Sequence, residues 1–225
     1  MIPGTLAIDR AKLPLAIVAM VVAALGGVFL FLRPRHSPHI DQDPEKRMFV
    51  EVKRVVSGQK IKLDDDHEEY LIYAGIRAPV GDEALYDEAT RRNSELVDKK
   101  KVRLRFDKER RDAEGRLLAY VFVDDLFVNE TLVREGLAFV RTTTSANRFS
   151  ERLLLAQGEA RGARRGVWAK RAAGTASYVS DPKYGNFHRP ECEEADKIPN
   201  ERKVNFKGDK SALDAGLAPC ARCKP

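Results

Sequence analysis

Three cysteines and one histidine near the C-terminal end of the chain have the spacing of a metal site. Three residues separate His188 from Cys192, a gap of 27 residues follows, and two residues separate Cys220 from Cys223. Three thiolates and one imidazole suit four-coordinate structural zinc. These are the only cysteines in the chain, so a disulfide framework is disfavoured. The sequence predicts a zinc site, and the alternative is a Cys220–Cys223 disulfide with Cys192 free.

Short elements must bring these four ligands together. We expect a turn or the start of a helix between His188 and Cys192, a strand over 203–206 and a helix over 211–215. The segment 178–225 has few apolar residues, and so small a module needs a metal to fold. The small-residue segment 171–177 reads as a linker. We therefore expect the module to unfold without zinc. We expect the preceding domain to stay intact when it does, because the linker separates the two.

A second organised stretch covers residues 111–141. Tyr120 lies within an apolar run that is typical of a buried strand, and Arg116 stands just before it. Asn129 is a suitable N-cap for a short helix, and Gly136 is placed to end that helix. This pattern predicts strand, turn, strand, short helix and strand.

The rest of the segment 48–170 alternates in the same way. Apolar residues at every second position predict a hairpin that turns at Ser57-Gly58, a strand over 71–76 and another over 102–106. Helices are expected near 83–100, 129–136 and 147–166. Several strands interrupted by one helix and closed by another favour an α+β fold built on a five-stranded OB-type barrel.

The motifs D-x-x-G-R-x-L-A-Y-V and V-N-x-x-L-V-x-x-G-L-A, followed by Gly166-Val167-Trp168, resemble the staphylococcal-type thermonuclease family. The resemblance covers residues 48–170, and it supports the barrel expected from the pattern. The matching positions are Asp112, Gly115, Arg116, Leu118, Ala119, Tyr120, Val121, Val128, Asn129, Leu132, Val133, Gly136, Leu137 and Ala138.

The resemblance implies phosphodiester hydrolysis by a calcium ion held on carboxylates, with a glutamate that assists the attacking water and two arginines that neutralise charge. The family's metal carboxylates align with Gln59 and Arg77, its glutamate with Val80 and one arginine with Ile72, so only Arg116 is retained. Calcium binding is therefore not expected. The nearby Asp82 and Glu83 could replace the lost carboxylates, although acidic residues are common at helix N-termini in any case.

A binding surface is the remaining role for such a barrel. OB folds hold single strands with basic grooves and stacking aromatic side chains, and the net charge of +6 and the pI near 9.2 agree with an acidic partner. Tyr73 and Tyr86 are stacking candidates, although strand tyrosines are more often core, and a protein partner is also open. The basic candidates are Lys60, Lys62, Arg77, Arg116, Arg161, Arg164 and Arg165, the last three of which could equally be a solvated helix face.

The uncharged segment 13–32, which begins at Leu13 and ends at Leu32, is long enough to cross a bilayer as a helix. We expect a single-pass anchor, with a cleaved signal peptide as the alternative. Basic residues lie on both sides of the segment and do not orient it. The short tail 1–12 and the secreted habit of the resembling family favour an extracytoplasmic soluble part, tethered by the polar linker 33–47.

The segment around the predicted zinc ligands resembles the metal-binding module of the Ada DNA-repair family, in which the first of four cysteines accepts a methyl group from DNA phosphate. His188 takes that position here and offers no thiolate, so zinc is expected to be structural and methyl transfer absent. Two functions remain in view. One is a membrane-anchored binding module for nucleic acid or protein that has lost nuclease activity, and the other is an active nuclease with a rearranged metal site.

Overall fold

The computed structural model describes residues 48–67, 69–112, 114–144, 148–171 and 174–225. All of them belong to one compact unit, Asp43–Pro225. Within these ranges no helix has the length and apolar character needed to cross a membrane. The tail 1–12, the expected span 13–32 and the linker 33–47 lie outside the described residues, so the anchor stays a prediction.

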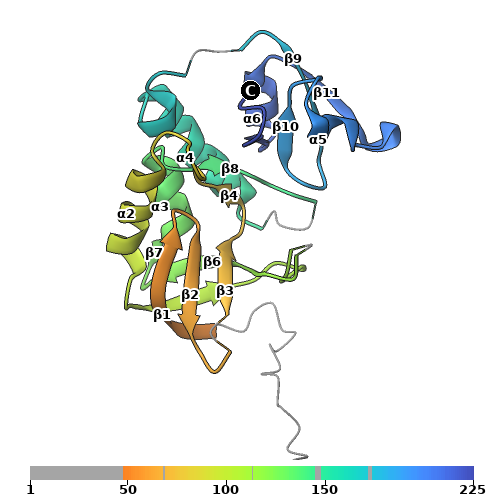
Figure 1. Ribbon diagram of the computed structural model, residues 1–225. Coiled ribbons are helices and arrows are strands. Elements are labelled where there is room, and N and C mark those ends of the chain that lie inside the picture. The colour runs from red at the N-terminus through yellow and green to blue at the C-terminus, as the bar shows by residue number, and fades with distance from the viewer. Residues whose placement is uncertain (1–47, 68, 113, 145–147, 172–173) are drawn as a thin grey trace, which may run out of the picture. The chain divides into compact units, whose positions relative to one another are not determined.

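Five strands close into the expected barrel (Figure 1). They hydrogen-bond in the order β3-β2-β1-β5-β6, and a parallel pairing between β3 and β6 closes the sheet on itself. Buried apolar side chains alternate with more exposed ones along β2 and β5, as the sequence pattern predicts. The strands are β1 (Met48–Ser57), β2 (Lys60–Asp64), β3 (Tyr70–Tyr73), β5 (Lys101–Arg105) and β6 (Leu117–Val123).

The strand expected over 71–76 is wrong in one respect, because the chain turns inside it. Gly75 adopts a φ of +76°, and a Cβ there would lie 2.8 Å from Leu153. This left-handed turn separates β3 from β4 (Ile76–Arg77), which pairs antiparallel with β8 (Phe139–Val140) outside the barrel sheet. The turn matters for function because it presents Arg77 at one end of the barrel.

Three helices cover the barrel, as expected: α2 (Tyr86–Val97), α3 (Val128–Arg134) and α4 (Ser150–Gly162), with the short strand β7 (Leu126–Phe127) before α3. The expected N-cap role of Asn129 is wrong, because Phe127 holds that position. Asn129 is instead fully buried. Its amide accepts a hydrogen bond from the Val121 N–H at 2.9 Å and donates one to the Ala74 carbonyl at 2.8 Å. It thus joins β6 to the turn after β3.

The C-terminal module is a small four-stranded sheet in the order β11-β9-β10-β12 with two short helices. The strand expected over 203–206 and the helix expected over 211–215 are confirmed within two residues. The elements are β9 (Ser177–Asp181), β10 (Asn186–His188), α5 (Glu193–Asp196), the 3-10 helix η2 (Asn200–Arg202), β11 (Val204–Lys207), α6 (Asp209–Asp214) and β12 (Ala218–Pro219).

The module packs directly on the barrel, contrary to the independence expected from the linker 171–177. One buried apolar cluster combines barrel residues with module residues, and we call it the junction cluster: Phe139, Ala160, Trp168, Tyr178, Phe187, Ala212, Leu213, Leu217 and Ala218. The buried Gln157 of α4 accepts a hydrogen bond from the Val140 N–H and donates one to the Leu213 carbonyl at 3.1 Å. The composition of the segment 171–177 does not predict this shared core, because the packing depends on residues outside that segment.

The end of the barrel domain is held by two glycines that meet face to face. Gly166 opens the 3-10 helix η1 (Gly166–Trp168) with a φ of +52°, and Gly136 follows α3 with a φ of +74°. A Cβ on Gly166 would lie 2.2 Å from the Gly136 carbonyl oxygen, so neither position has room for a side chain. This contact fixes Trp168 in the junction cluster.

Candidate ligand cavity and metal centre

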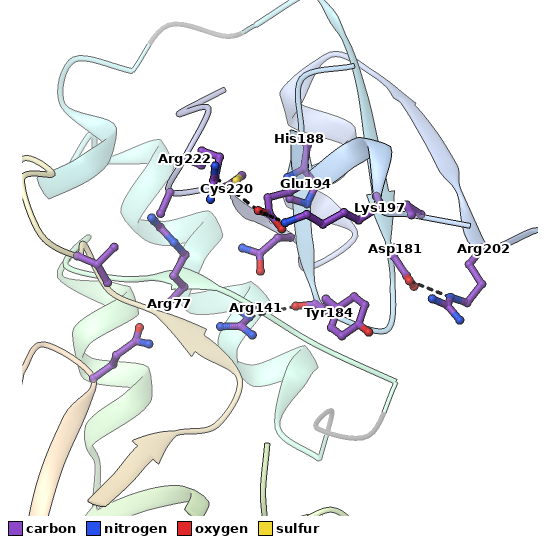
Figure 2. A pocket seen from close by; sticks show the side chains of 15 residues that line it. Arg77, Arg141, Asp181, Tyr184, His188, Glu194, Lys197, Arg202, Cys220 and Arg222 are labelled. Atoms are coloured by element: carbon purple, nitrogen blue, oxygen red, sulfur yellow. Dashed lines mark hydrogen bonds and ion pairs between the residues drawn. The ribbon is translucent and has the colours of Figure 1, made fainter. Parts of the chain in front are cut away.

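A cavity of about 600 Å³ lies between the β4–β8 end of the barrel and the C-terminal module (Figure 2). The barrel contributes Gln59, Arg77, Val80 and Arg141. The remaining lining residues come from the module and are Asp181, Tyr184, Asn186, His188, Glu194, Lys197, Ile198, Arg202, Cys220, Ala221 and Arg222.

Three of the substituted family positions line this cavity together. Gln59 lies in the hairpin turn before β2, Arg77 ends β4, and Val80 lies in the loop after β4. The Gln59 side chain accepts a hydrogen bond from the Ala78 N–H, so it joins the hairpin to that loop. Ile72, at the position of the lost arginine, is almost fully buried in β3 and contributes no polar group to the cavity.

Arg77 forms a buried ion pair where the resemblance places a metal carboxylate. Its side chain is only 5% exposed, and one guanidinium nitrogen lies 2.5 Å and 2.7 Å from the two carboxylate oxygens of Glu83. Glu83 also accepts a hydrogen bond from the Val80 N–H at 2.8 Å. A buried cation paired in this way repels a divalent metal ion and occupies the nearest carboxylate.

The second replacement carboxylate, Asp82, is also engaged. Both of its oxygens lie 3.0 Å from the Lys224 ammonium, and this hydrogen bond and charge lower the pKa of Asp82. Its side chain is 87% exposed, so the pair is weak in energy. Neither Asp82 nor Glu83 is among the residues that line the cavity. Asp82 and Glu83, the two carboxylates considered from the sequence, thus pair with Lys224 and Arg77 and do not line this cavity.

Arg116, the one retained family position, does not line the cavity. Its guanidinium donates to Asp112 at 2.6 Å and to Glu114 at 2.7 Å within its own loop. Asp112 also accepts hydrogen bonds from the backbone of that loop, including the Arg116 N–H at 2.8 Å. The D-x-x-G-R motif thus forms a self-contained turn that holds Arg116 on the rim of the barrel.

Arg141, which follows β8, was missed by the sequence reasoning. Its backbone N–H donates to the Gly75 carbonyl at 2.9 Å, and its guanidinium donates to the Tyr184 carbonyl of the module at 3.2 Å (Figure 2). In the part of the chain that the structure describes, no carboxylate pairs with it. Burial, followed by the nearby positive charges of Arg77 and Arg116, lowers the pKa of Arg141. A sequence signal was available only as an arginine directly after a core strand.

The module side of the cavity carries further charges, most of them paired. Arg202 donates to the buried Asp181 at 2.9 Å, and Lys197 lies 2.8 Å from Glu194 (Figure 2). Arg222 forms ion pairs with Glu193 and Glu194. Tyr184 leaves about half of its side chain exposed and lines the cavity.

His188, Cys192, Cys220 and Cys223 come together as the sequence predicts. Their candidate ligand atoms all lie within 4.8 Å of one another, and three of the four residues are buried. Of the turn and the helix start expected between His188 and Cys192, the turn is present, since the Cys192 N–H donates a hydrogen bond to the Arg189 carbonyl at 3.1 Å. All three cysteines are free thiols, so the disulfide alternative is not adopted. This cluster could hold a metal ion, and its donor set suits zinc.

The other residues expected to contact nucleic acid are spread over two regions. Lys60 and Lys62 flank the ring of Tyr70 on the barrel, with the Lys60 ammonium 4.4 Å from the ring centroid. The stacking role expected for Tyr73 is wrong, because that side chain is buried and its hydroxyl donates to Asn93 at 2.9 Å. The cluster at the end of α4 makes protein contacts, in which Arg161 pairs with Asp214, Arg164 donates to the Ala169 carbonyl and Arg165 to the Arg134 carbonyl.

A closed five-stranded barrel covered by three helices is an OB-type α+β fold. Residues 71–170 match the family model described as Staphylococcal nuclease homologue. The chain is 34% identical over 143 residues to Endonuclease YncB of Bacillus subtilis, an alignment that covers 60% of this chain and 67% of that relative. It is 32% identical over 130 residues to the Thermonuclease of Staphylococcus hyicus, covering 52% and 74% respectively. The chain belongs to the staphylococcal nuclease family.

A third relative shows how far the likeness extends. The SPbeta prophage-derived endonuclease YokF of Bacillus subtilis is 41% identical over 97 residues, which are 42% of this chain and 31% of that relative. The family model ends at residue 170 and so leaves out the C-terminal module. The module side of the cavity therefore lies outside the part of the chain that the family model matches.

Proposed function

We propose that this protein is a nucleic-acid binding member of the nuclease family whose barrel has lost calcium-dependent hydrolysis. The observation that carries this proposal is the buried Arg77–Glu83 ion pair at the position where a metal carboxylate belongs. Hydrolysis needs a cation that polarises the phosphate and a base for water, and the cavity offers Val80 where the base belongs. Phosphate binding needs only positive charge and donors.

The candidate binding surface joins the basic residues of β2 to the end face of the barrel. Lys60 and Lys62 lie over the ring of Tyr70, which is 37% exposed, so the three side chains form one basic and aromatic patch. Arg116 stands on the rim, with about half of its side chain exposed. A short single strand is the expected ligand, because OB barrels hold single strands on such surfaces.

The C-terminal module is proposed to hold a structural zinc ion. His188, Cys192, Cys220 and Cys223 would supply all four ligands, which leaves no open position for chemistry. The resemblance to the Ada module agrees with this role. Anchoring through the segment 13–32 completes the proposal and would keep the binding surface near a membrane.

The second candidate function is an active nuclease, because two of the relatives carry the name endonuclease. The two are separated by incubating the purified protein with single-stranded and double-stranded DNA and calcium, then repeating the digest with magnesium and manganese. We expect no cleavage above that of a blank preparation. Metal-dependent cleavage that disappears in Arg116→Ala would establish the nuclease and refute the proposal.

Binding is measured separately, by fluorescence anisotropy of a labelled oligonucleotide across a salt series. Binding releases the cations that are condensed on the phosphates, and this release is less favourable at a higher salt concentration. We therefore expect the affinity to fall as salt rises. The double variant Lys60→Ala/Lys62→Ala should weaken binding several-fold and reduce the salt slope by about one or two units. Arg91→Ala, which removes an exposed charge on α2, is the matched control. Equal binding by all three proteins would contradict the proposed surface.

A further inference from the structure

The cavity beside Arg77 holds more positive than negative charge. Among its lining residues, three cations come from the module and two from the barrel, against the carboxylates of Asp181 and Glu194. Arg77 is neutralised by Glu83, and the module cations share Asp181, Glu193 and Glu194. The remaining charge is concentrated on Arg141.

Among the charged residues that line the cavity, Arg141 is the one for which the described structure shows no ion pair. Its guanidinium carries several N–H donors, yet its only bond in the described structure is the one to the Tyr184 carbonyl. A partly buried cation without a counter-ion is unfavourable, and the lowered pKa of Arg141 reflects the same crowding. An anion placed in the cavity would satisfy the free donors and relieve the repulsion between Arg141 and Arg77.

The size and walls of the cavity indicate a small ligand. Its volume of about 600 Å³ falls within the range of small-molecule sites. The module bounds one side and the barrel the other, so the cavity suits a ligand end better than the middle of a continuous strand. The half-exposed ring of Tyr184 offers a stacking surface beside Arg141, and Asn186 offers an amide.

We propose that this cavity binds the terminal phosphate of a nucleotide, with Arg141 as the phosphate ligand and Tyr184 as the stacking surface for the base. A phosphate monoester carries more negative charge than an internal diester, which matches the excess positive charge of the lining. Naming a nucleotide rests on the proposed nucleic-acid function. The phosphate can belong to a free mononucleotide or to the end of a strand.

The test is calorimetric titration of the full chain, purified in detergent with zinc present, with adenosine 5′-monophosphate, adenosine and inorganic phosphate. We expect the nucleotide to bind more tightly than adenosine or phosphate alone. Arg141→Ala should weaken binding by at least about tenfold, since an arginine–phosphate contact is a charge-assisted pair. Arg141→Lys should retain part of the affinity, because it keeps the charge and loses the planar fork. Arg91→Ala should leave the affinity unchanged.

A second variant guards against misfolding of the first. Arg222 is exposed and lies on the module wall, so Arg222→Ala should fold and should still weaken binding several-fold. The proposal is overturned if adenosine binds as tightly as the nucleotide. It is also overturned if Arg141→Ala and Arg222→Ala both bind the nucleotide with the affinity of the unaltered protein. Failure of the nucleotide to bind at all would overturn it as well.

Strand ends distinguish this proposal from the proposed function. Oligonucleotides of one sequence with a phosphorylated or a hydroxyl 5′ end, and the matching pair at the 3′ end, are compared by anisotropy. Preference for a phosphorylated end, lost in Arg141→Ala, identifies the strand end as the source of the phosphate. Oligonucleotide binding that ignores both ends and Arg141 would assign the phosphate to a free mononucleotide. The same result together with a mononucleotide that fails to bind would refute the cavity proposal and leave the proposed function standing. Nucleotide binding without oligonucleotide binding would refute the proposed function and leave the cavity proposal standing.

Discussion

The junction cluster makes a quantitative prediction about cooperativity. Leu213 lies on α6 of the module, is 1% exposed and belongs to the cluster that includes Phe139 and Trp168 of the barrel domain. Replacing it by alanine removes buried methyl groups and leaves a space that the junction cannot fully close. Such substitutions cost about 2–5 kcal/mol. In a unit of this size, each kcal/mol lowers the melting temperature by about 2–4 °C, so we expect a decrease of roughly 6–12 °C for a cost near 3 kcal/mol.

The assay uses the only tryptophan in the chain. Trp168 lies in the junction cluster, so its fluorescence reports the contact between module and barrel, whereas far-ultraviolet circular dichroism reports all of the folded structure. If the two parts unfold together, both signals give one midpoint in the unaltered protein, and Leu213→Ala shifts both by the same amount. Zinc is kept saturating throughout, so that metal loss does not add to the shift.

The matched control is the same substitution at an exposed leucine nearby. Leu155 lies on α4 with 67% of its surface exposed, and Leu155→Ala should change the free energy of unfolding by less than about 0.5 kcal/mol. A small shift in Leu213→Ala, or a two-step transition in which circular dichroism keeps its midpoint while Trp168 fluorescence moves, would refute the shared core. The independence expected from the linker composition would then be restored.

Three further outcomes are expected. Removing the metal with a strong chelator should unfold the module and shift Trp168 emission to longer wavelength, and an unchanged spectrum would contradict a structural zinc. Gly166→Ala should destabilise by more than about 2 kcal/mol in urea unfolding, because its Cβ would meet the Gly136 carbonyl, whereas Gly162→Ala, with nothing within 4 Å, should be neutral or slightly stabilising. Burial alone would raise the pKa of Glu130, but hydrogen bonds from two arginines outweigh it and lower the pKa below 4.5. Its stabilising effect is therefore present above that value and lost as pH falls through the folded pKa, so Glu130→Gln should flatten the acid limb of stability measured by denaturation against pH.

The barrel could be predicted from sequence because local pattern and global fold agree there. The run around Tyr120 is buried almost throughout, and the hairpin at Ser57-Gly58 turns where expected. The motif that carries the resemblance forms β6, α3 and the turns around them. The convergence of the four candidate metal ligands could also be predicted, because Cys-x2-Cys and His-x3-Cys spacings bring side chains together through local geometry.

Side-chain pairing and long-range packing could not be predicted in the same way. Asn129 has the residue type of an N-cap, yet tertiary structure uses its amide to join two backbone segments inside the barrel. The segment 171–177 reads as a flexible linker, but Arg171 and Gly174 both bond to Asp209 of the module. Arg141 belongs to no sequence motif. It lines a cavity only because the module packs against the barrel, and the sequence pattern does not predict that packing.

The proposed replacement of a metal carboxylate by Arg77 would change how the barrel binds a phosphate. A carboxylate site attracts a phosphate only through the cation that it holds, and the same cation polarises the phosphorus centre and activates water. Guanidinium groups attract the phosphate directly, without a metal, but they supply neither the Lewis acid nor the base that activates water. In the proposed function, a site with Val80 in place of the base and Arg141 at the same end of the barrel would bind a phosphate without cleaving its ester bond.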